Sequence, residues 1–270
     1  MGALVARRLP LLVALLVLTA CASDGPPILR PAPTTSSLGP PSSAPPVPTT
    51  AAGPPGVVTL LVTDLRLINS EESDNAFRVL IESAAPAVAV KVTGVPTPNL
   101  VVLVCPVDDL GRRSAPAADC VTPASGETVQ VPHRPAYRGV EIVQVGVSSG
   151  GPAGNSTAVS EIAIRYPATS READFRLPAL QEGESGSRPL LKMTPAGSGA
   201  YSATATFTAA GGGPGEAELT LVSDTANQNT ARGPGPSLSG NLIPPAEAGF
   251  RIRNRGSTAL LGTTLDVLFP

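Results

Sequence analysis

Three arginines alternate with other residues near the C-terminal end of this chain, in the stretch Phe250-Arg251-Ile252-Arg253-Asn254-Arg255. Successive side chains of a β-strand point to opposite faces, so a strand here places Arg251, Arg253 and Arg255 on one face. Phe250 and Ile252 then lie on the other face. Guanidinium groups form paired hydrogen bonds with carboxylates and phosphates, so this row predicts a site for an anionic polymer or a lipid headgroup.

A structural role for the same arginines is the alternative, and it is the one that we favour. Glu216 and Glu218 alternate against the apolar residues Ala217, Leu219 and Leu221 in the same manner. Opposite charges on neighbouring strands form cross-strand pairs, and charged side chains also protect sheet edges from aggregation.

Two cysteines, Cys105 and Cys120, enclose 14 residues that contain Pro106, Asp108-Asp109, Gly111 and Pro116. This composition is typical of a loop, and the pair predicts a disulfide that stabilises the fold by about 3 kcal/mol in the chain-entropy model. Metal binding by the pair is the weaker interpretation, because the spacing matches no zinc pattern.

Nothing in the sequence indicates catalysis, so we expect neither enzymatic activity, nor a cofactor, nor a metal. His133 is the single histidine, lies between Pro132 and Pro135, and is expected in an exposed loop. No Gly-x-Ser-x-Gly motif accompanies it, as a serine hydrolase of that class requires. The glycine-rich stretch 211–215 lacks the following Lys-Ser/Thr of a phosphate-binding loop and is expected to form a hairpin loop.

Two acidic clusters raise the question of calcium: Glu71-Glu72-Ser73-Asp74-Asn75 and Asp108-Asp109. Calcium takes six to eight oxygen ligands, and neither cluster has the spacing of a calcium-binding loop. We expect both to be solvated turns.

The elements that position these residues are predicted to be strands. Short alternating or β-branched runs recur between clusters of Pro, Gly, Asn, Asp and Ser, and no stretch has a helical stripe over three turns. The predicted strands are 57–62, 77–81, 88–92, 100–104, 128–131, 140–147, 159–164, 175–177, 201–207, 217–222, 250–252 and 260–269. This pattern predicts an all-β protein built from β-sandwiches.

A domain boundary is expected near Tyr166-Pro167-Ala168-Thr169-Ser170, where an apolar run ends in a proline and a polar link. The boundary divides the chain into two modules, 57–167 and 168–270, each with the length of an immunoglobulin-like or jelly-roll-like sandwich. The likeness to immunoglobulin domains is one of architecture only, because the chain has no Trp.

The N-terminus has the layout of an export signal. Arg7 and Arg8 precede an apolar run, Leu9 to Leu18, that contains one proline. This run is shorter than the roughly 20 residues that a transmembrane helix needs, so residues 1–20 are predicted to be a signal peptide.

The residues Leu18-Thr19-Ala20-Cys21, where the apolar run ends, resemble the lipobox of bacterial lipoproteins. The resemblance implies cleavage before Cys21, a diacylglyceryl group on its sulfur, and attachment to a membrane with the chain facing the extracytoplasmic side. Two or three acyl chains hold a protein durably at a membrane where one does not. Ordinary secretion is the alternative, because Ala20-Cys21-Ala22 also fits a secretory cleavage site.

Residues 21–56 form a Pro/Ser/Thr-rich linker, with 11 prolines between Ala22 and Gly56. The stretch has few large apolar side chains, so burial of them would not offset the conformational entropy lost on folding. In polyproline II form it would reach on the order of 100 Å. We expect a tether that holds the β-modules away from the membrane.

Two function classes remain open for the β-modules. Loss of Arg7 and Arg8 with the signal would change the formal net charge from −2 to −4, which is unlike the strongly basic field of a nucleic-acid-binding protein. The first class is a structural or protein-interaction module of the cell envelope, and the second is a binding module for an anionic envelope polymer or glycan. The lack of Trp disfavours sugar stacking and therefore favours the first class.

Overall fold

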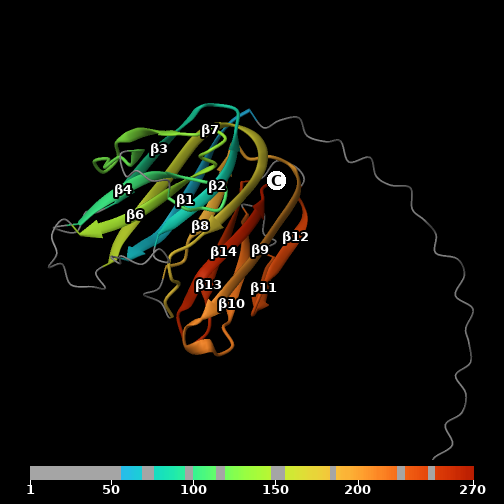
Figure 1. The fold of residues 1–270 in the computed structure, drawn as a ribbon. Helices are drawn as coiled ribbons and strands as arrows, with labels where there is room; N and C mark the ends of the chain where they lie inside the picture. The colour runs from blue at the N-terminus through green and yellow to red at the C-terminus, as the bar shows by residue number, and fades with distance from the viewer. Residues whose placement is uncertain are drawn as a thin grey trace, which may run out of the picture. The chain divides into compact units, whose positions relative to one another are not determined.

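The computed structural model describes residues 56–68, 76–94, 100–113, 119–146, 156–182, 187–223, 229–242 and 247–270 (Figure 1). The predicted signal peptide, Cys21 and all but the last residue of the linker lie outside this range. The first seven strands are β1 (Gly56–Ile68), β2 (Phe77–Ser83), β3 (Ala87–Gly94), β4 (Leu100–Val107), β5 (Thr128–Pro132), β6 (Gly139–Gly146) and β7 (Ser156–Arg176). The others are β8 (Leu190–Thr194), β9 (Gly199–Ala209), β10 (Ala217–Ser223), β11 (Thr230–Gly233), β12 (Ser237–Leu242), β13 (Ala248–Asn254) and β14 (Leu260–Leu268), with a short 3₁₀ turn at Ala210–Gly212. The predicted all-β fold is confirmed.

The strand pairings, all antiparallel, form two layers that share β7. One layer has the order β5-β3-β7-β1-β8-β13-β10-β11, and the other has the order β4-β6-β2-β7-β14-β9-β12. The edges of the two layers approach each other, with β4 near β5 at one end and β11 near β12 at the other. The arrangement is therefore a sandwich that extends over both halves of the chain.

β7 passes from one layer to the other in its middle. Its first part pairs with β1 and β3, as in the register Val90↔Ile164, and its last part pairs with β2 and β14, as in Leu265↔Phe175. The exchange of partners occurs around Pro167, which lacks the N–H that a central strand position would use. The expected link at 166–170 is thus the middle of a 21-residue strand. We correct the boundary at 167/168 accordingly and describe 57–167 and 168–270 as halves of one sandwich.

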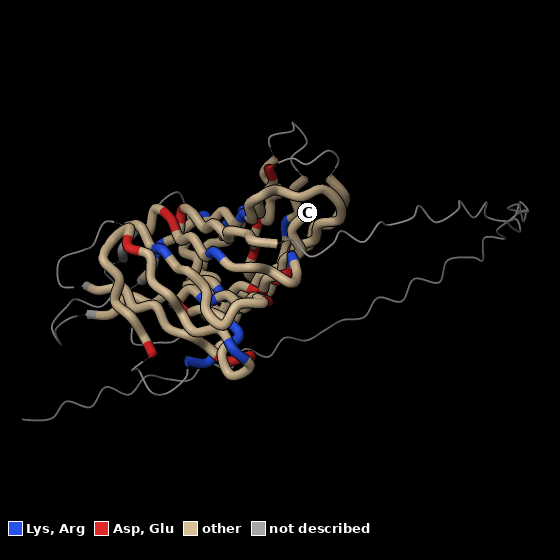
Figure 2. The backbone as a smooth tube through the Cα atoms, turned by 90° about the horizontal axis from the view of Figure 1, so that it is seen from above, with Lys and Arg blue, Asp and Glu red and all other residues tan. Residues whose placement is uncertain are grey.

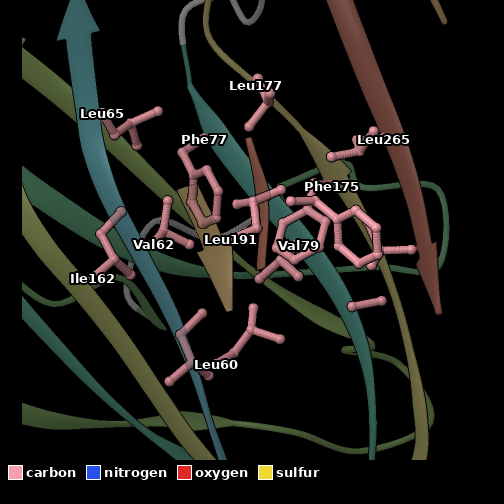
Figure 3. Packing of buried hydrophobic residues seen from close by; sticks show 14 of the residues in the cluster. Leu60, Val62, Leu65, Phe77, Val79, Ile162, Phe175, Leu177, Leu191 and Leu265 are labelled. Carbon is pink, nitrogen blue, oxygen red and sulfur yellow. The ribbon is translucent and has the colours of Figure 1, made fainter. Parts of the chain in front are cut away.

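The two halves also share one hydrophobic core. A row of aromatic rings runs through it, in which Phe175 contacts Phe77 of the first half, with ring centroids 6.2 Å apart, and Phe269 of the second, at 6.4 Å. Phe250 continues the row at 5.9 Å from Phe269. Figure 3 shows Phe77 and Phe175 beside Leu191 and Leu265, which come from different strands of the second half. Since burial of a large aromatic side chain stabilises a fold by about 2 kcal/mol or more, separation of the halves would be costly.

One loop prediction is wrong. The glycine-rich stretch 211–215 was expected to close a hairpin, but β9 and β10 do not pair with each other. β9 pairs with β12 and β14, and β10 pairs with β11 and β13. The stretch therefore connects the two layers, and the positive φ angles of Gly211 and Gly212, 81° and 74°, allow the tight turn that starts the crossing.

Candidate functional site

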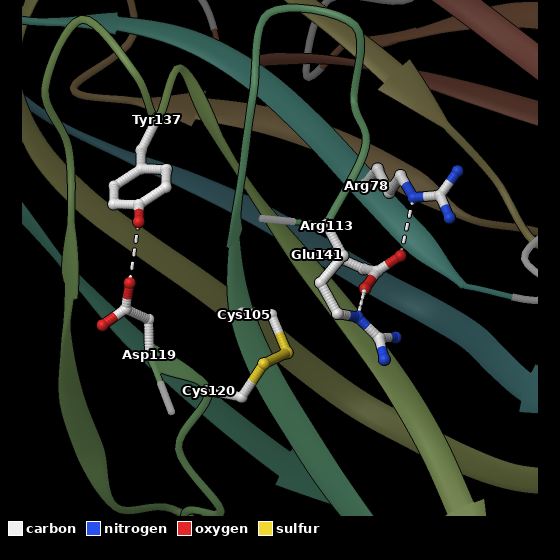
Figure 4. The surroundings of a disulfide bond; sticks show 7 residues. All are labelled: Arg78, Cys105, Arg113, Asp119, Cys120, Tyr137 and Glu141. Atoms are coloured by element: carbon white, nitrogen blue, oxygen red, sulfur yellow. Dashed lines mark hydrogen bonds and ion pairs between the residues drawn. A yellow bond between two sulfur atoms is a disulfide. The ribbon is translucent and has the colours of Figure 1, made fainter. Parts of the chain in front are cut away.

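The predicted disulfide is present in the structure, where Cys105 at the end region of β4 is bonded to Cys120 (Figure 4). The Cys105 side chain is completely buried. Next to Cys120, the Asp119 carboxylate accepts a hydrogen bond of 2.8 Å from the Tyr137 hydroxyl, which ties this side of the loop to the chain before β6. The disulfide therefore joins the core strand β4 to Cys120, and the hydrogen bond between Tyr137 and Asp119 holds the chain next to Cys120 in place.

A buried carboxylate lies directly across the sheet from this disulfide. Glu141 on β6 is the cross-strand partner of Cys105 and is 1% exposed. Arg78 donates to one carboxylate oxygen from Nε at 2.7 Å, and Arg113 donates to the other from Nε at 2.6 Å (Figure 4). A carboxylate is tolerated away from water only when charged hydrogen-bond donors of this kind satisfy it. The triad of Glu141, Arg78 and Arg113 therefore holds together β6, β2 and the loop between the two cysteines.

A second buried carboxylate, that of Glu218 on β10 in the half 168–270, forms ion pairs with three arginines. Its register partners are Arg253 on β13 and Arg232 on β11, and both donate to it, Arg232 from Nε at 2.5 Å. Arg255 adds contacts of 3.0 and 3.2 Å from its Nη2 to the two oxygens. The cross-strand pairing expected at Glu218 is therefore present, with Arg232 as a further member.

Of the three arginines predicted to share one face of a strand, Arg251 and Arg253 lie in β13 and Arg255 does not. Phe250 and Ile252 point into the core and Arg251 and Arg253 lie on the opposite face, as expected. β13 ends at Asn254, however, whose side-chain amide donates to the carbonyls of Leu180 and Thr258 and whose side-chain oxygen accepts the N–H of Gly256. Arg255 thus lies beyond the strand and reaches Glu218 from the following turn.

Glu216, the other expected acidic partner, precedes β10 and is exposed. It takes part through its backbone carbonyl, which accepts the N–H groups of Arg255 at 2.8 Å and of Gly256 at 3.2 Å. These bonds position the turn that carries Arg255.

Arg251 has a different environment from the rest of the row. Among the described residues it pairs with Asp64, which is 3.8 Å away and has a 63% exposed side chain, so the pair is weak. The Arg251 side chain itself is 39% exposed. The Nε atoms of Arg251 and Arg253 are buried and have no acceptor within the described part of the chain.

Glu218, Arg251 and Arg253 are among the residues that line an open groove of about 660 Å³ on the outer face of the sheet. Glu218, Thr220 and Val222 of β10 form its floor. The walls come from the neighbouring strands, with Thr230 and Arg232 of β11 on one side and Arg251 and Arg253 of β13 on the other. Two of the predicted anion-binding arginines, Arg251 and Arg253, therefore line a cavity, whereas Arg255 is not among its described lining residues.

His133 is not the exposed loop residue that was expected. It follows β5, is 7% exposed, and its ring Nε2 lies 3.1 Å from the carbonyl oxygen of Ile81. Its backbone N–H donates to the carbonyl of Pro86. The flanking prolines were correct loop signals, but the histidine faces the β2–β3 turn and fastens it.

Of the two acidic clusters, only Asp108-Asp109 lies within the described residues. Asp108 is an exposed turn residue whose carboxylate accepts from the backbone N–H groups of Leu110 and Arg112 and from the Arg112 side chain. These hydrogen bonds, led by that from the Arg112 backbone, lower the pKa of the Asp108 carboxyl. The cluster 71–75 lies outside the described residues. Across the described ranges, no three His, Cys, Asp or Glu side chains are grouped as metal ligands.

The candidate lipidation site, Cys21, also lies outside the described residues. Within the described ranges, no helix has the length and hydropathy needed to cross a bilayer. Comparison of the chain with protein-family models and with curated proteins finds no match.

Proposed function

We propose that this protein is an exported lipoprotein, cleaved before Cys21 and held at a membrane by lipid on that cysteine. The Pro-rich linker then carries the sandwich away from the membrane surface. There, on the extracytoplasmic side, the sandwich serves as a non-enzymatic module that contacts another envelope component.

The observation that carries the proposal is the position of Cys21. It directly follows Leu18-Thr19-Ala20 at the end of an apolar run, as in a lipobox. The sequence has three cysteines, and the disulfide between Cys105 and Cys120 does not use Cys21. A buried disulfide supports export, since such bonds persist mainly in oxidising compartments.

The architecture supports a binding or structural role. The strands bury their apolar residues in one core, and the two charged clusters, at Glu141 and Glu218, join neighbouring strands to each other. A sandwich of this kind presents sheet faces and loops to a partner.

The test is metabolic labelling of cells with an alkyne fatty acid, followed by fractionation. The wild type is expected in the membrane fraction with label, and Cys21→Ser is expected without label, in the medium or as uncleaved precursor. The double variant Cys105→Ser/Cys120→Ser is the matched control and should keep the label. Wild-type protein that carries no lipid would refute the proposal.

Cross-linking of the labelled protein in intact cells, followed by mass spectrometry, tests the second part of the proposal. We expect a repeated cross-link to one envelope component. Cross-links that change with every preparation would contradict a specific interaction.

A further inference from the structure

We propose that the groove between β11 and β13, which we call the arginine groove, binds one strand of a linear polyanion through oxyanion groups. The groove is formed by Glu218, Thr220 and Val222, Thr230 and Arg232, and Arg251 and Arg253. The inference names a ligand class for the sandwich but does not rest on the lipid anchor.

The first argument is the local charge. Four guanidinium groups, those of Arg232, Arg251, Arg253 and Arg255, meet only two carboxylates among the described residues, Glu218 and the exposed Asp64. The described residues that line the groove therefore carry a net positive charge, although the whole chain is formally negative. Basic and acidic positions are otherwise interspersed along the chain (Figure 2).

The second argument is preorganisation. Glu218 is 5% exposed at its side chain and holds Arg232, Arg253 and Arg255 in fixed positions. Their side chains nevertheless remain 59%, 30% and 35% exposed, so they can still donate to a ligand. Arginines fixed before binding lose less side-chain entropy when an anion arrives.

The third argument is unused donor capacity. A buried donor without an acceptor is unfavourable, and the Nε atoms of Arg251 and Arg253 are such donors within the described residues. A small rotation of the Arg251 side chain toward an oxyanion in the groove would give its Nε an acceptor. Arg251 is the freer of the two, because its pairing with Asp64 is long and exposed.

The dimensions indicate an extended ligand. The floor from Glu218 to Val222 covers four strand steps, or about 13 Å, and Arg251 and Arg253 are two steps apart, or about 7 Å. A single small anion would occupy little of a groove of about 660 Å³. A chain with a phosphate or carboxylate on successive units could meet both arginines at once.

The lining also distinguishes this ligand from others. None of the described residues that line the groove is aromatic, so a neutral sugar would find no stacking surface. A bilayer presents a flat surface, whereas Arg251 and Arg253 line an open groove together with Thr220 and Thr230. Thr220 and Thr230 supply hydroxyl groups between the arginines.

The experiment measures binding of the purified full chain to inorganic polyphosphate and to polygalacturonate, by calorimetry at several salt concentrations. The two polymers separate phosphate from carboxylate as the recognised oxyanion. We expect the wild type to bind at least one of them at about 50 mM salt, and Arg251→Gln to bind about tenfold more weakly with unchanged melting temperature. The slope of log K against log salt should be shallower by about one contact.

Two further variants make the test specific. Arg138→Gln is the matched control, since Arg138 is 46% exposed and forms a similarly long pair of 3.7 Å with an exposed Glu82 in the other half. Its binding should equal that of the wild type. Glu218→Gln tests preorganisation: Arg232, Arg253 and Arg255 are no longer held in place, so polymer affinity should fall even though the groove gains positive charge.

The proposal is overturned if the wild type binds neither polymer at low salt, or if Arg138→Gln weakens binding as much as Arg251→Gln. It is also overturned if the full chain binds vesicles of anionic phospholipid through Arg251 but neither soluble polymer, because the ligand would then be a membrane surface. Absence of lipid on Cys21 would leave this result unaffected, so the two proposals fail separately.

Discussion

Replacement of Glu218 by Gln is the sharpest test of the structural role assigned to the arginine cluster. The carboxylate is 5% exposed and accepts from three guanidinium groups, so its loss leaves Arg232, Arg253 and Arg255 facing one another without a counter-charge. Removal of one partner from a fully buried pair costs about 3–5 kcal/mol.

The magnitude must be reduced because the arginines are not buried. Their side chains are 30–59% exposed, and water screens and solvates them after the carboxylate is gone. We therefore expect a loss of about 2–3 kcal/mol in the free energy of unfolding. For a domain of this size, that corresponds to a decrease in melting temperature of about 5–10 °C.

Urea denaturation and thermal melting of the purified protein check this value. Glu216→Gln is the matched control, two residues away and exposed, and should lie within about 0.5 kcal/mol of the wild type. In a double-mutant cycle, Glu218→Gln and Arg253→Gln should couple by about 1 kcal/mol or more, because the two side chains are in contact. A Glu218→Gln protein as stable as the Glu216→Gln protein would refute the reasoning.

Three further predictions concern other parts of the sandwich. Replacement of both Cys105 and Cys120 by Ala should lower the free energy of unfolding by about 3 kcal/mol, as measured by urea denaturation. Mass spectrometry of the non-reduced wild-type digest should find the linked peptide, and two free thiols in protein taken from cells would contradict the pairing. Burial, and then the nearby carboxylates Asp266 and Glu172, raise the pKa of the Asp174 carboxyl. A raised carboxyl pKa means that the charged form of Asp174 destabilises the folded state at neutral pH and that this effect is lost once the carboxyl is protonated. Asp174→Asn should therefore stabilise the protein at neutral pH, by no more than about 0.5 kcal/mol after screening. In thermal melts, this gain should vanish as the pH falls below the raised pKa. Gly139→Ala should destabilise the protein by about 2 kcal/mol or more, because the added Cβ would lie 2.2 Å from the Val79 carbonyl oxygen, whereas Gly213→Ala, with open space around it, should melt like the wild type; equal melting of the two variants would contradict the close β2–β6 approach.

The positions of most strands could be predicted from hydrophobic alternation. The run Tyr201–Phe207 became the centre of β9, and the run Val88–Val92 became β3, because each strand buries every second side chain in the core. β8, β11 and β12 were missed. They are short, and Ser237–Leu242 contains serine, glycine and asparagine, so their place in the sheet depends on neighbours that are distant in sequence.

The candidate site was predicted less completely. Alternation was enough to place Arg251 and Arg253 on one face and to suggest Glu218 as a partner. Arg232 was missed because its stretch, Thr230–Gly233, has no strand signal, and only the pairing of β11 with β10 brings it to Glu218. Glu141 was missed for a similar reason, since nothing near it in the sequence points to Arg78 or Arg113.

The sequence by itself determined the β class, the pairing of an even number of cysteines, and the export and lipidation hypothesis at Cys21, because each depends on local composition or spacing. Only the tertiary structure decided that the halves form one sandwich. A proline followed by polar residues at 167–170 has the composition of a linker, yet here β7 continues through it and exchanges its partners between the two layers. The physical reason is that a strand is stabilised by hydrogen bonds and packing from both neighbours, and these neighbours, β1, β2, β3 and β14, come from opposite ends of the described chain.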